Sequence, residues 1–163
     1  MTTVYLSLGS NLGDREKNLR DAIAALPPAE AQPARISSFY ETEPVDFTEQ
    51  PWFLNCVVEV ETQLPPLELL HALREIESHL GSKKEFAKGP RLLDIDILTY
   101  GDATMDTPEL QVPHPRMTQR RFVLAPLTEL APGLRHPSWN ATAGELLARS
   151  EDHGEVRRFP ARA

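Results

Sequence analysis

The chain has 163 residues, 40% of them hydrophobic, and this length suits a single domain over residues 1–163 around one core. No run of about 18 apolar residues could cross a bilayer, and the start MTTVYLSLGSN lacks the basic and apolar parts of a signal peptide, so we expect a cytoplasmic protein with no membrane partner. The 17 basic and 24 acidic residues give a net charge of -7, which argues against a general nucleic-acid-binding surface.

The first elements are a strand and a helix. VYLSLG, residues 4–9, predicts a strand, and GSNLGD leads into a helix that ends at Pro27. The apolar residues Leu19, Ile23 and Leu26 recur at helical spacing and mark the buried side of this helix.

The next four elements alternate in the same way. Residues 35–45 and 53–63 predict two strands joined by a polar loop, residues 65–81 an amphipathic helix, and residues 92–101 a further strand. The order strand, helix, strand, strand, helix, strand is that of a ferredoxin-like α+β domain, the βαββαβ core.

A C-terminal extension follows this core. Residues 107–117 are punctuated by prolines, and short helices are expected near residues 118–130 and 142–150. We expect the tail, residues 155–163, to be frayed.

Two carboxylates interrupt an apolar strand in KGPRLLDIDILTYG, residues 88–101. In a strand of period two, Asp94 and Asp96 point to one face, and ionised carboxylates side by side require compensating positive charge. An isolated D-x-D pair often caps a turn or pairs with Lys or Arg. Because Lys88 and Arg91 lie directly upstream, a site for a metal-chelated phosphate chain is the stronger interpretation.

Other motifs are ambiguous by themselves. GSNLGD, residues 9–14, lacks the G-K-[ST] ending of a P-loop, so a tight turn with Asn11 or Asp14 as the helix cap is the simpler interpretation. The single cysteine, Cys56, lies in an apolar strand and is expected to be a packed thiol rather than a nucleophile or ligand.

The stretch VPHPRMTQRRF, residues 112–122, combines a histidine with three arginines. His114 lies between two prolines in a rigid loop, where it is either structural or functional. Arg116 and Arg120 share a face if the segment is helical, and they form either a solvated face or a clamp on phosphate oxygens.

Phe53 and Asn55 share one face of their strand. By periodicity they are the edge of a core, whereas an aromatic ring beside a carboxamide could also bind a flat heterocycle.

Five segments together resemble the 6-hydroxymethyl-7,8-dihydropterin pyrophosphokinases of folate biosynthesis. The likeness runs from about residue 4 to about residue 132, in order and with similar spacing. The segments are SLGSNLGDREKNL, SSFYETEPV, QPWFLNCVVEVET, KGPRLLDIDIL and VPHPRMTQRRFVLAPL.

This resemblance implies a ferredoxin-like fold and transfer of an intact pyrophosphoryl group from ATP to the hydroxymethyl group of the reduced pterin, with release of AMP. It implies two Mg²⁺ ions held by the residues that match Asp94 and Asp96. We also expect a monomer whose partners are these two substrates.

The resemblance also assigns residues to the two substrates. The residues expected to act in catalysis are Lys84, Arg91, Asp94 and Asp96. Those matching the pterin pocket are Gly9, Thr42, Glu43, Val45, Phe53, Asn55 and Phe122. Those around the nucleotide are Glu77, Lys84, Lys88, Arg91, Ile97, His114 and Arg120. The loop GSKKEFAKGPR departs from the family pattern, because Ser82 and lysines stand where arginines are common.

Two other functions fit part of the sequence. A two-metal phosphodiesterase or nuclease could use the same aspartates, although it usually needs more ligands than one D-x-D supplies. An RNA-binding or ligand-sensing module could share the strand order, but the chain is acidic and lacks the K/R-G-F/Y-G/A-F motif.

Overall fold

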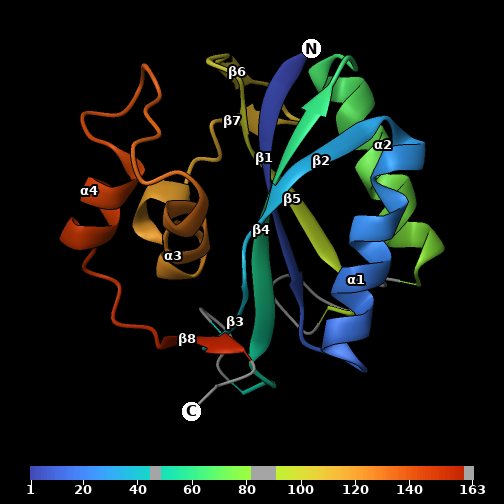
Figure 1. The fold of residues 1–163 in the computed structure, drawn as a ribbon, viewed down its shortest axis with the longest axis horizontal. Helices are drawn as coiled ribbons and strands as arrows, with labels where there is room; N and C mark the ends of the chain where they lie inside the picture. Colours follow the sequence, from blue (N-terminus) through green and yellow to red (C-terminus); the bar gives the residue numbers. More distant parts are fainter. Residues whose placement is uncertain (45–48, 82–90, 160–163) are drawn as a thin grey trace.

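The computed structural model describes residues 1–44, 49–81 and 91–159. The expected βαββαβ order is present, with a C-terminal extension that adds a short strand pair, two helices and a final strand (Figure 1). The strands are β1 (Thr2–Ser10), β2 (Ala31–Ile36), β3 (Phe39–Thr42), β4 (Phe53–Thr62), β5 (Asp94–Tyr100), β6 (Met105–Asp106), β7 (Gln111–Val112) and β8 (Val156–Phe159). The helices are α1 (Arg15–Ala25), α2 (Pro66–His79), α3 (Arg121–Leu130) and α4 (Ala143–Arg149), with short 3-10 turns η1 (Pro27–Ala29) and η2 (Met117–Gln119).

The main sheet is antiparallel and has the strand order β5-β1-β4-β3-β8, with β2 also paired to β4. The predicted strand over 35–45 is divided into β2 and β3. Between them, the Ser37 hydroxyl accepts a hydrogen bond from the Val57 N–H at 2.9 Å, which interrupts the backbone pairing with β4. β2 and β3 together occupy the second-strand position of a ferredoxin-like sheet. The predicted α+β fold is therefore confirmed.

The two faces of the sheet are covered differently. Helices α1 and α2 lie on one side of the sheet, and α3 and α4 on the other (Figure 1). The first face, called the α1/α2 face, carries the larger core, to which Leu19 and Leu73 contribute at 0% exposure. Tyr5, Val57 and Leu98 belong to a smaller cluster on the opposite α3 face. The site lies on the α3 face.

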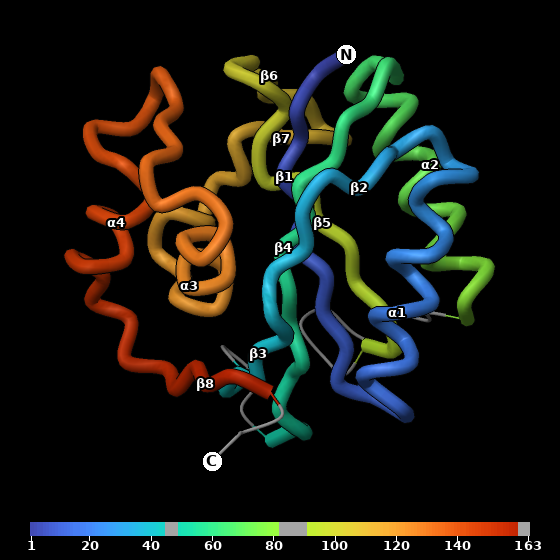
Figure 2. The backbone as a smooth tube through the Cα atoms, viewed as in Figure 1, coloured from blue at the N-terminus to red at the C-terminus, as the bar shows by residue number. Residues whose placement is uncertain are grey.

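The tail departs from expectation. Residues 156–159 form β8, which pairs with β3, so this segment is not frayed. Figure 2 shows the chain leaving α4 and running back to the end of the sheet beside β3. Residues 160–163 lie outside the described part of the chain. In that part, no helix is long and apolar enough to span a membrane.

Candidate active site

Asp94 and Asp96 open the outer strand β5 and point to the same face. Asp94 lies opposite Gly9, and Asp96 opposite Ser7, while Ile95 and Ile97 are 0% and 3% exposed in the α1/α2 core. Both carboxylates are half-buried. The prediction that they share a face is confirmed, and the apolar alternation of β5 holds them there.

The outer edge of β5 is closed by helix α2. Glu77 Oε2 accepts the N–H of Ile95 at 2.7 Å, and Arg74 donates to the Ile95 carbonyl at 2.8 Å. Arg74 and Glu77 also pair with each other at 2.9 Å. The backbone polar groups of an edge strand need partners of this kind, so the helix holds β5 at the point where the aspartates begin.

Glu77 lies next to this acidic pair. Burial raises the pKa of its carboxyl; Arg74 and the Ile95 N–H oppose the shift, and the charge of Asp94 adds to it. Asp94 therefore has a second carboxyl group nearby, whose ionisation is disfavoured by burial.

Two adjoining hollows lie beside the aspartates. One of about 360 Å³ is lined by Arg74, Glu77, Ser78, Arg91, Leu93, Asp94 and Asp96. The second, of about 340 Å³, shares Arg74 and Asp96 and extends past Ile97 to His114. Four of the predicted nucleotide residues, Glu77, Arg91, Ile97 and His114, are thus brought together along one extended space. The charged side chains lining it are of both signs, with Arg74 and Arg91 beside Glu77, Asp94 and Asp96.

Three predicted nucleotide residues do not line these hollows in the described part of the chain. Arg120 lines neither hollow, and its guanidinium lies 5.5 Å from the centroid of the Phe122 ring. Lys84 and Lys88 fall outside the described residues.

His114 is held by the backbone around it. Its N–H donates to the Leu98 carbonyl at 2.8 Å, and its Nδ1 accepts the N–H of Arg116 at 3.2 Å. Burial, and then the charges of Arg120 and Arg116, lower the pKa of the imidazole. With Nδ1 occupied as an acceptor, the neutral ring carries its proton on Nε2.

Gly9, Thr42, Phe53 and Asn55 form the predicted pterin side. Asn55 pairs with Gly9 across the sheet and donates from Nδ2 to Thr42 Oγ1 at 2.5 Å. A Cβ at position 9 would lie 2.5 Å from Asn55 Oδ1 and 3.5 Å from Phe53 Cδ1. Gly9 is therefore needed for the close approach of the amide. Phe53 is half-buried and belongs to neither hydrophobic cluster of the described residues, unlike a core-edge residue.

The other predicted pterin residues lie around this group. Phe122 is the second residue of helix α3 and packs against the α3-face cluster. Glu43 is tied to the C-terminal segment, because its Oε1 accepts the N–H of Glu155 at 2.8 Å. Val45 falls outside the described residues.

Asn11 has a role that the sequence did not reveal. Asp14, and not Asn11, caps α1 by accepting the N–H of Lys17. Asn11 is 2% exposed; its Oδ1 accepts the N–H of Arg91 at 2.7 Å, and its Nδ2 donates to the Pro51 carbonyl at 2.9 Å. It therefore joins the segment before β5 to the segment before β4. The sequence offered one signal for this role: the turn needs only one side chain to cap the helix, and the carboxamide of Asn can form up to four hydrogen bonds with other segments.

The donor set at β5 fits a hard divalent cation bound together with phosphate. Across the described ranges there is no group of three or more His, Cys, Asp or Glu side chains that could hold a metal ion. At β5 the side chains that would hold one are Asp94 and Asp96. Magnesium bound to a nucleotide usually takes one or two carboxylates and completes its shell with phosphate oxygens and water. The residues present match that requirement.

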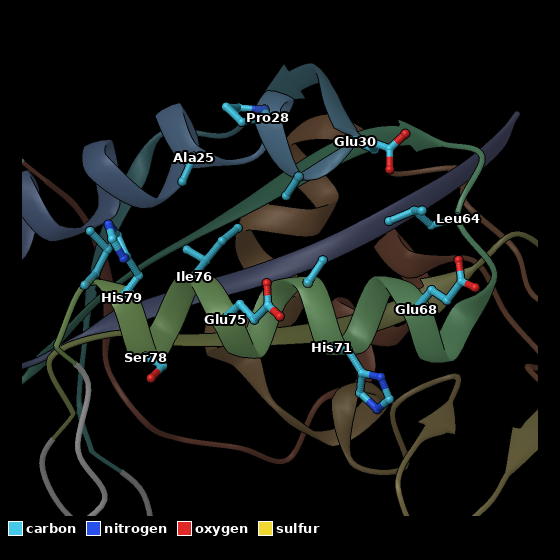
Figure 3. Close-up of a pocket in the computed structure, with 13 residues that line it drawn as sticks. Ala25, Pro28, Glu30, Leu64, Glu68, His71, Glu75, Ile76, Ser78 and His79 are labelled. Carbon is cyan, nitrogen blue, oxygen red and sulfur yellow. The ribbon is translucent and has the colours of Figure 1, made fainter.

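A groove of about 810 Å³ lies on the opposite face of the sheet, between α1 and α2 (Figure 3). Glu68, His71, Glu75 and His79 of α2 line it, and in Figure 3 the side chain of Ile76 points from α2 toward α1 while that of His71 points away. None of the predicted site residues lines this groove, and we do not assign the chemistry to it.

The sequence of this chain is similar to those of known proteins. Residues 5–132 match the family model described as 7,8-dihydro-6-hydroxymethylpterin-pyrophosphokinase. The chain is 49% identical over 127 residues to the 2-amino-4-hydroxy-6-hydroxymethyldihydropteridine pyrophosphokinase of Bacillus subtilis. The aligned region covers 77% of this chain and 76% of that protein. The chain is 41% identical over 160 residues to the protein of that name from Pseudomonas aeruginosa, which covers 96% of each chain.

Solved structures show the same fold. Wild-type HPPK-DHPS of Plasmodium falciparum, determined with pteroate, has a TM-score of 0.74 and 18% sequence identity over 90% of this chain. This chain spans 42% of the length of the Plasmodium protein, so the likeness concerns one part of that larger molecule.

Proposed function

This chain belongs to the 7,8-dihydro-6-hydroxymethylpterin-pyrophosphokinase family, and we propose on that basis that it transfers the pyrophosphoryl group of ATP to 6-hydroxymethyl-7,8-dihydropterin. The products are AMP and the pterin diphosphate, and the reaction is a step in folate biosynthesis. The supporting observation is that Asp94 and Asp96 share one sheet face with Gly9 and Asn55. A phosphate site and a heterocycle site are then neighbours on adjoining strands.

We assign the metal requirement of the reaction to two Mg²⁺ ions at Asp94 and Asp96. Bound there with the triphosphate, the ions would offset charge on the phosphate oxygens. The nearby Arg91 is 7% exposed, and its main chain is fixed by Asn11, so its position depends little on side-chain mobility at the surface. Lys84 and Lys88 are proposed to add positive charge over the nucleotide, with Glu77, Ile97, His114 and Arg120 around it.

The pterin is proposed to lie over the row formed by Gly9 and Asn55, between Phe53 and Phe122. The buried amide of Asn55 would read the donors and acceptors of the ring edge, while Thr42 fixes that amide by accepting its N–H. Glu43 and Val45 would complete the border of the pocket.

The transfer needs no protein nucleophile. The hydroxymethyl oxygen attacks the β-phosphorus, the bond from that phosphorus to the bridging α-phosphate oxygen breaks, AMP leaves, and the hydroxyl proton passes to solvent. Cys56 could not replace this oxygen, because it is fully buried and burial raises the pKa of its thiol to about 12.

The proposal is tested by incubating the purified chain with ATP, Mg²⁺ and the reduced hydroxymethylpterin, and measuring AMP by chromatography. Asp96→Ala should abolish AMP formation and leave the unfolding transition intact. The matched control is Asp21→Ala, which removes an exposed carboxylate that pairs with Lys17 on α1.

The alternatives give different products in the same assay. A phosphodiesterase or nuclease would hydrolyse a phosphate ester in the absence of pterin, and a binding module would form no AMP at all. An Asp96→Ala variant with normal turnover would refute the metal assignment.

The single domain over residues 1–163, the monomeric state and the cytoplasmic location remain predictions. Light scattering after size-exclusion chromatography tests the second of these, and cell fractionation tests the third.

A further inference from the structure

The C-terminal strand joins the sheet beside the predicted pterin residues. Val156 of β8 pairs with Thr42, and Arg157 pairs with Glu41. Glu43 and Glu155 continue the contact, since the Glu43 N–H donates to the Glu155 carbonyl at 3.0 Å. Thr42 is also the acceptor for Asn55, so β8 lies next to a strand that orients the pterin-side amide. Figures 1 and 2 both show β8 beside β3 at this end of the sheet.

Arg157 connects three segments that are distant in the sequence. Its Nη2 and Nε donate to Glu41 Oε1 at 2.8 and 3.2 Å. Its guanidinium also lies 4.9 Å from the centroid of the Trp52 ring, a cation–π geometry. The side chain therefore holds β3 and the residue directly before Phe53 at the same time.

A second arginine completes this arrangement. Arg15 donates to the other oxygen of Glu41, Oε2, at 2.8 Å and to the Trp52 carbonyl at 3.0 Å. Arg157 and then Arg15 lower the pKa of Glu41, so this carboxylate is charged at neutral pH. Trp52 is consequently fixed through its ring by Arg157 and through its main chain by Arg15.

We propose that Arg157 is a positioning residue for the pterin site. By holding Trp52 against Glu41, it fixes the direction in which the chain enters β4, and with it the orientation of Phe53 and Asn55. The inference rests on the proposed pyrophosphokinase function. Because 55% of the Arg157 side chain is exposed, its ion pair adds little to folding stability. Its effect should appear in substrate binding.

The test compares Arg157→Ala and Arg157→Lys with a matched control, Arg20→Ala. Arg20 makes the same two kinds of contact, with Glu16 at 2.8 and 3.0 Å and with the Phe39 ring at 5.1 Å, but it lies on α1. Initial rates are measured with pterin varied at saturating ATP, and with ATP varied at saturating pterin.

For Arg157→Ala we expect the KM for pterin to rise about fivefold, equivalent to about 1 kcal/mol at about 1.4 kcal/mol per factor of ten. The kcat and the KM for ATP should stay within about twofold, as expected for lost ground-state positioning of one substrate. The KM for pterin of Arg157→Lys should lie between those of Arg157→Ala and the unmodified chain, because an ammonium group lacks the planar fork of guanidinium. Arg20→Ala should match the unmodified chain.

A spectroscopic measurement gives a second readout. The chain has two tryptophans, so a Trp139→Phe background leaves Trp52 as the sole emitter. Arg157→Ala in this background should shift the emission of Trp52, and Arg20→Ala should not.

The outcomes separate this inference from the proposed reaction. If the unmodified chain forms no AMP, the reaction is wrong, while Trp52 emission still reports whether Arg157 holds the segment. Unchanged pterin KM in Arg157→Ala, an equal rise in the KM for ATP, or loss of the fold would each overturn the positioning role.

Discussion

Gly9→Ala tests the geometry of the pterin side most directly. The added Cβ would lie 2.5 Å from Asn55 Oδ1, whereas ordinary contact begins at 3.4 Å, so the amide has to move by about 0.9 Å. Directed away from Thr42, a movement of that size stretches the bond from Asn55 Nδ2 to Thr42 Oγ1 from 2.5 Å to about 3.4 Å, beyond the usual range for such a bond. A buried polar group left without its partner costs about 1–3 kcal/mol.

We expect the affinity of Gly9→Ala for the reduced pterin to fall about tenfold or more, because the moved amide no longer presents its donors and acceptors to the ring. Affinity for ATP with Mg²⁺ should be unchanged, since Gly9 lines neither of the hollows beside Asp94 and Asp96, where we propose that the nucleotide binds. Isothermal titration calorimetry measures both affinities in one buffer.

A matched glycine provides the control. A Cβ at Gly133 would meet no atom within 4 Å, so Gly133→Ala should bind pterin normally. In an Asn55→Ala background, Gly9→Ala should add little further loss, because the clashing oxygen is absent. Normal pterin binding by Gly9→Ala, or additive losses in the double variant, would refute the assignment of Asn55 as the group displaced.

Three further predictions concern buried groups. Asn11→Ala should lower the free energy of unfolding by about 1–3 kcal/mol in urea titrations, because the N–H of Arg91 loses its acceptor, whereas the exposed Asn140→Ala should change it by under about 0.5 kcal/mol. The lowered pKa of His114 means that the unfolded chain takes up a proton at higher pH than the folded chain does, so the free energy of unfolding should fall as pH drops through and below 6.5. His114→Gln should flatten this dependence below about pH 7. Cys56 should resist a thiol reagent in native buffer and react once the chain is unfolded, since burial raises the pKa of its thiol to about 12; rapid labelling of the native chain would contradict its packing.

Elements with strong local patterns were predictable from the sequence. Helix α2 begins at Pro66, its buried residues Leu69, Leu70, Leu73 and Ile76 follow the helical period, and it ends at His79, two residues before Gly81. β8 was missed because the partners of its arginines are remote: Arg157 meets Glu41, and Arg158 approaches Glu129 at 3.5 Å. A four-residue strand held by contacts more than 100 positions away, such as the bond from Arg157 to Glu41, leaves no local pattern.

The site divided in the same way. The common face of Asp94 and Asp96 follows from period two alone, and the structure confirms it. The grouping of Gly9, Asn55 and Thr42 depends on which strands are neighbours, so periodicity could not give it, whereas the family resemblance did. Arg74 reaches the outer edge of β5 only because helix α2 passes beside that strand. The spacing of residues in the sequence does not predict this arrangement.

The register between β1 and β5 decides which face of the sheet the aspartates occupy. The pairing shifts between Tyr5 and Leu6, where Tyr5 faces Thr99 but Leu6 faces Ile97, so Leu98 is the extra residue of a bulge. Without that bulge Leu8 would face Asp96, and the carboxylate would point with Leu8 into the α1/α2 core. The bulge instead returns Asp96 to the face of Ser7, and Asp94 to the face of Gly9. One inserted residue therefore allows the same strand to fill the core with Ile95 and Ile97 and to present its charges beside the pterin side.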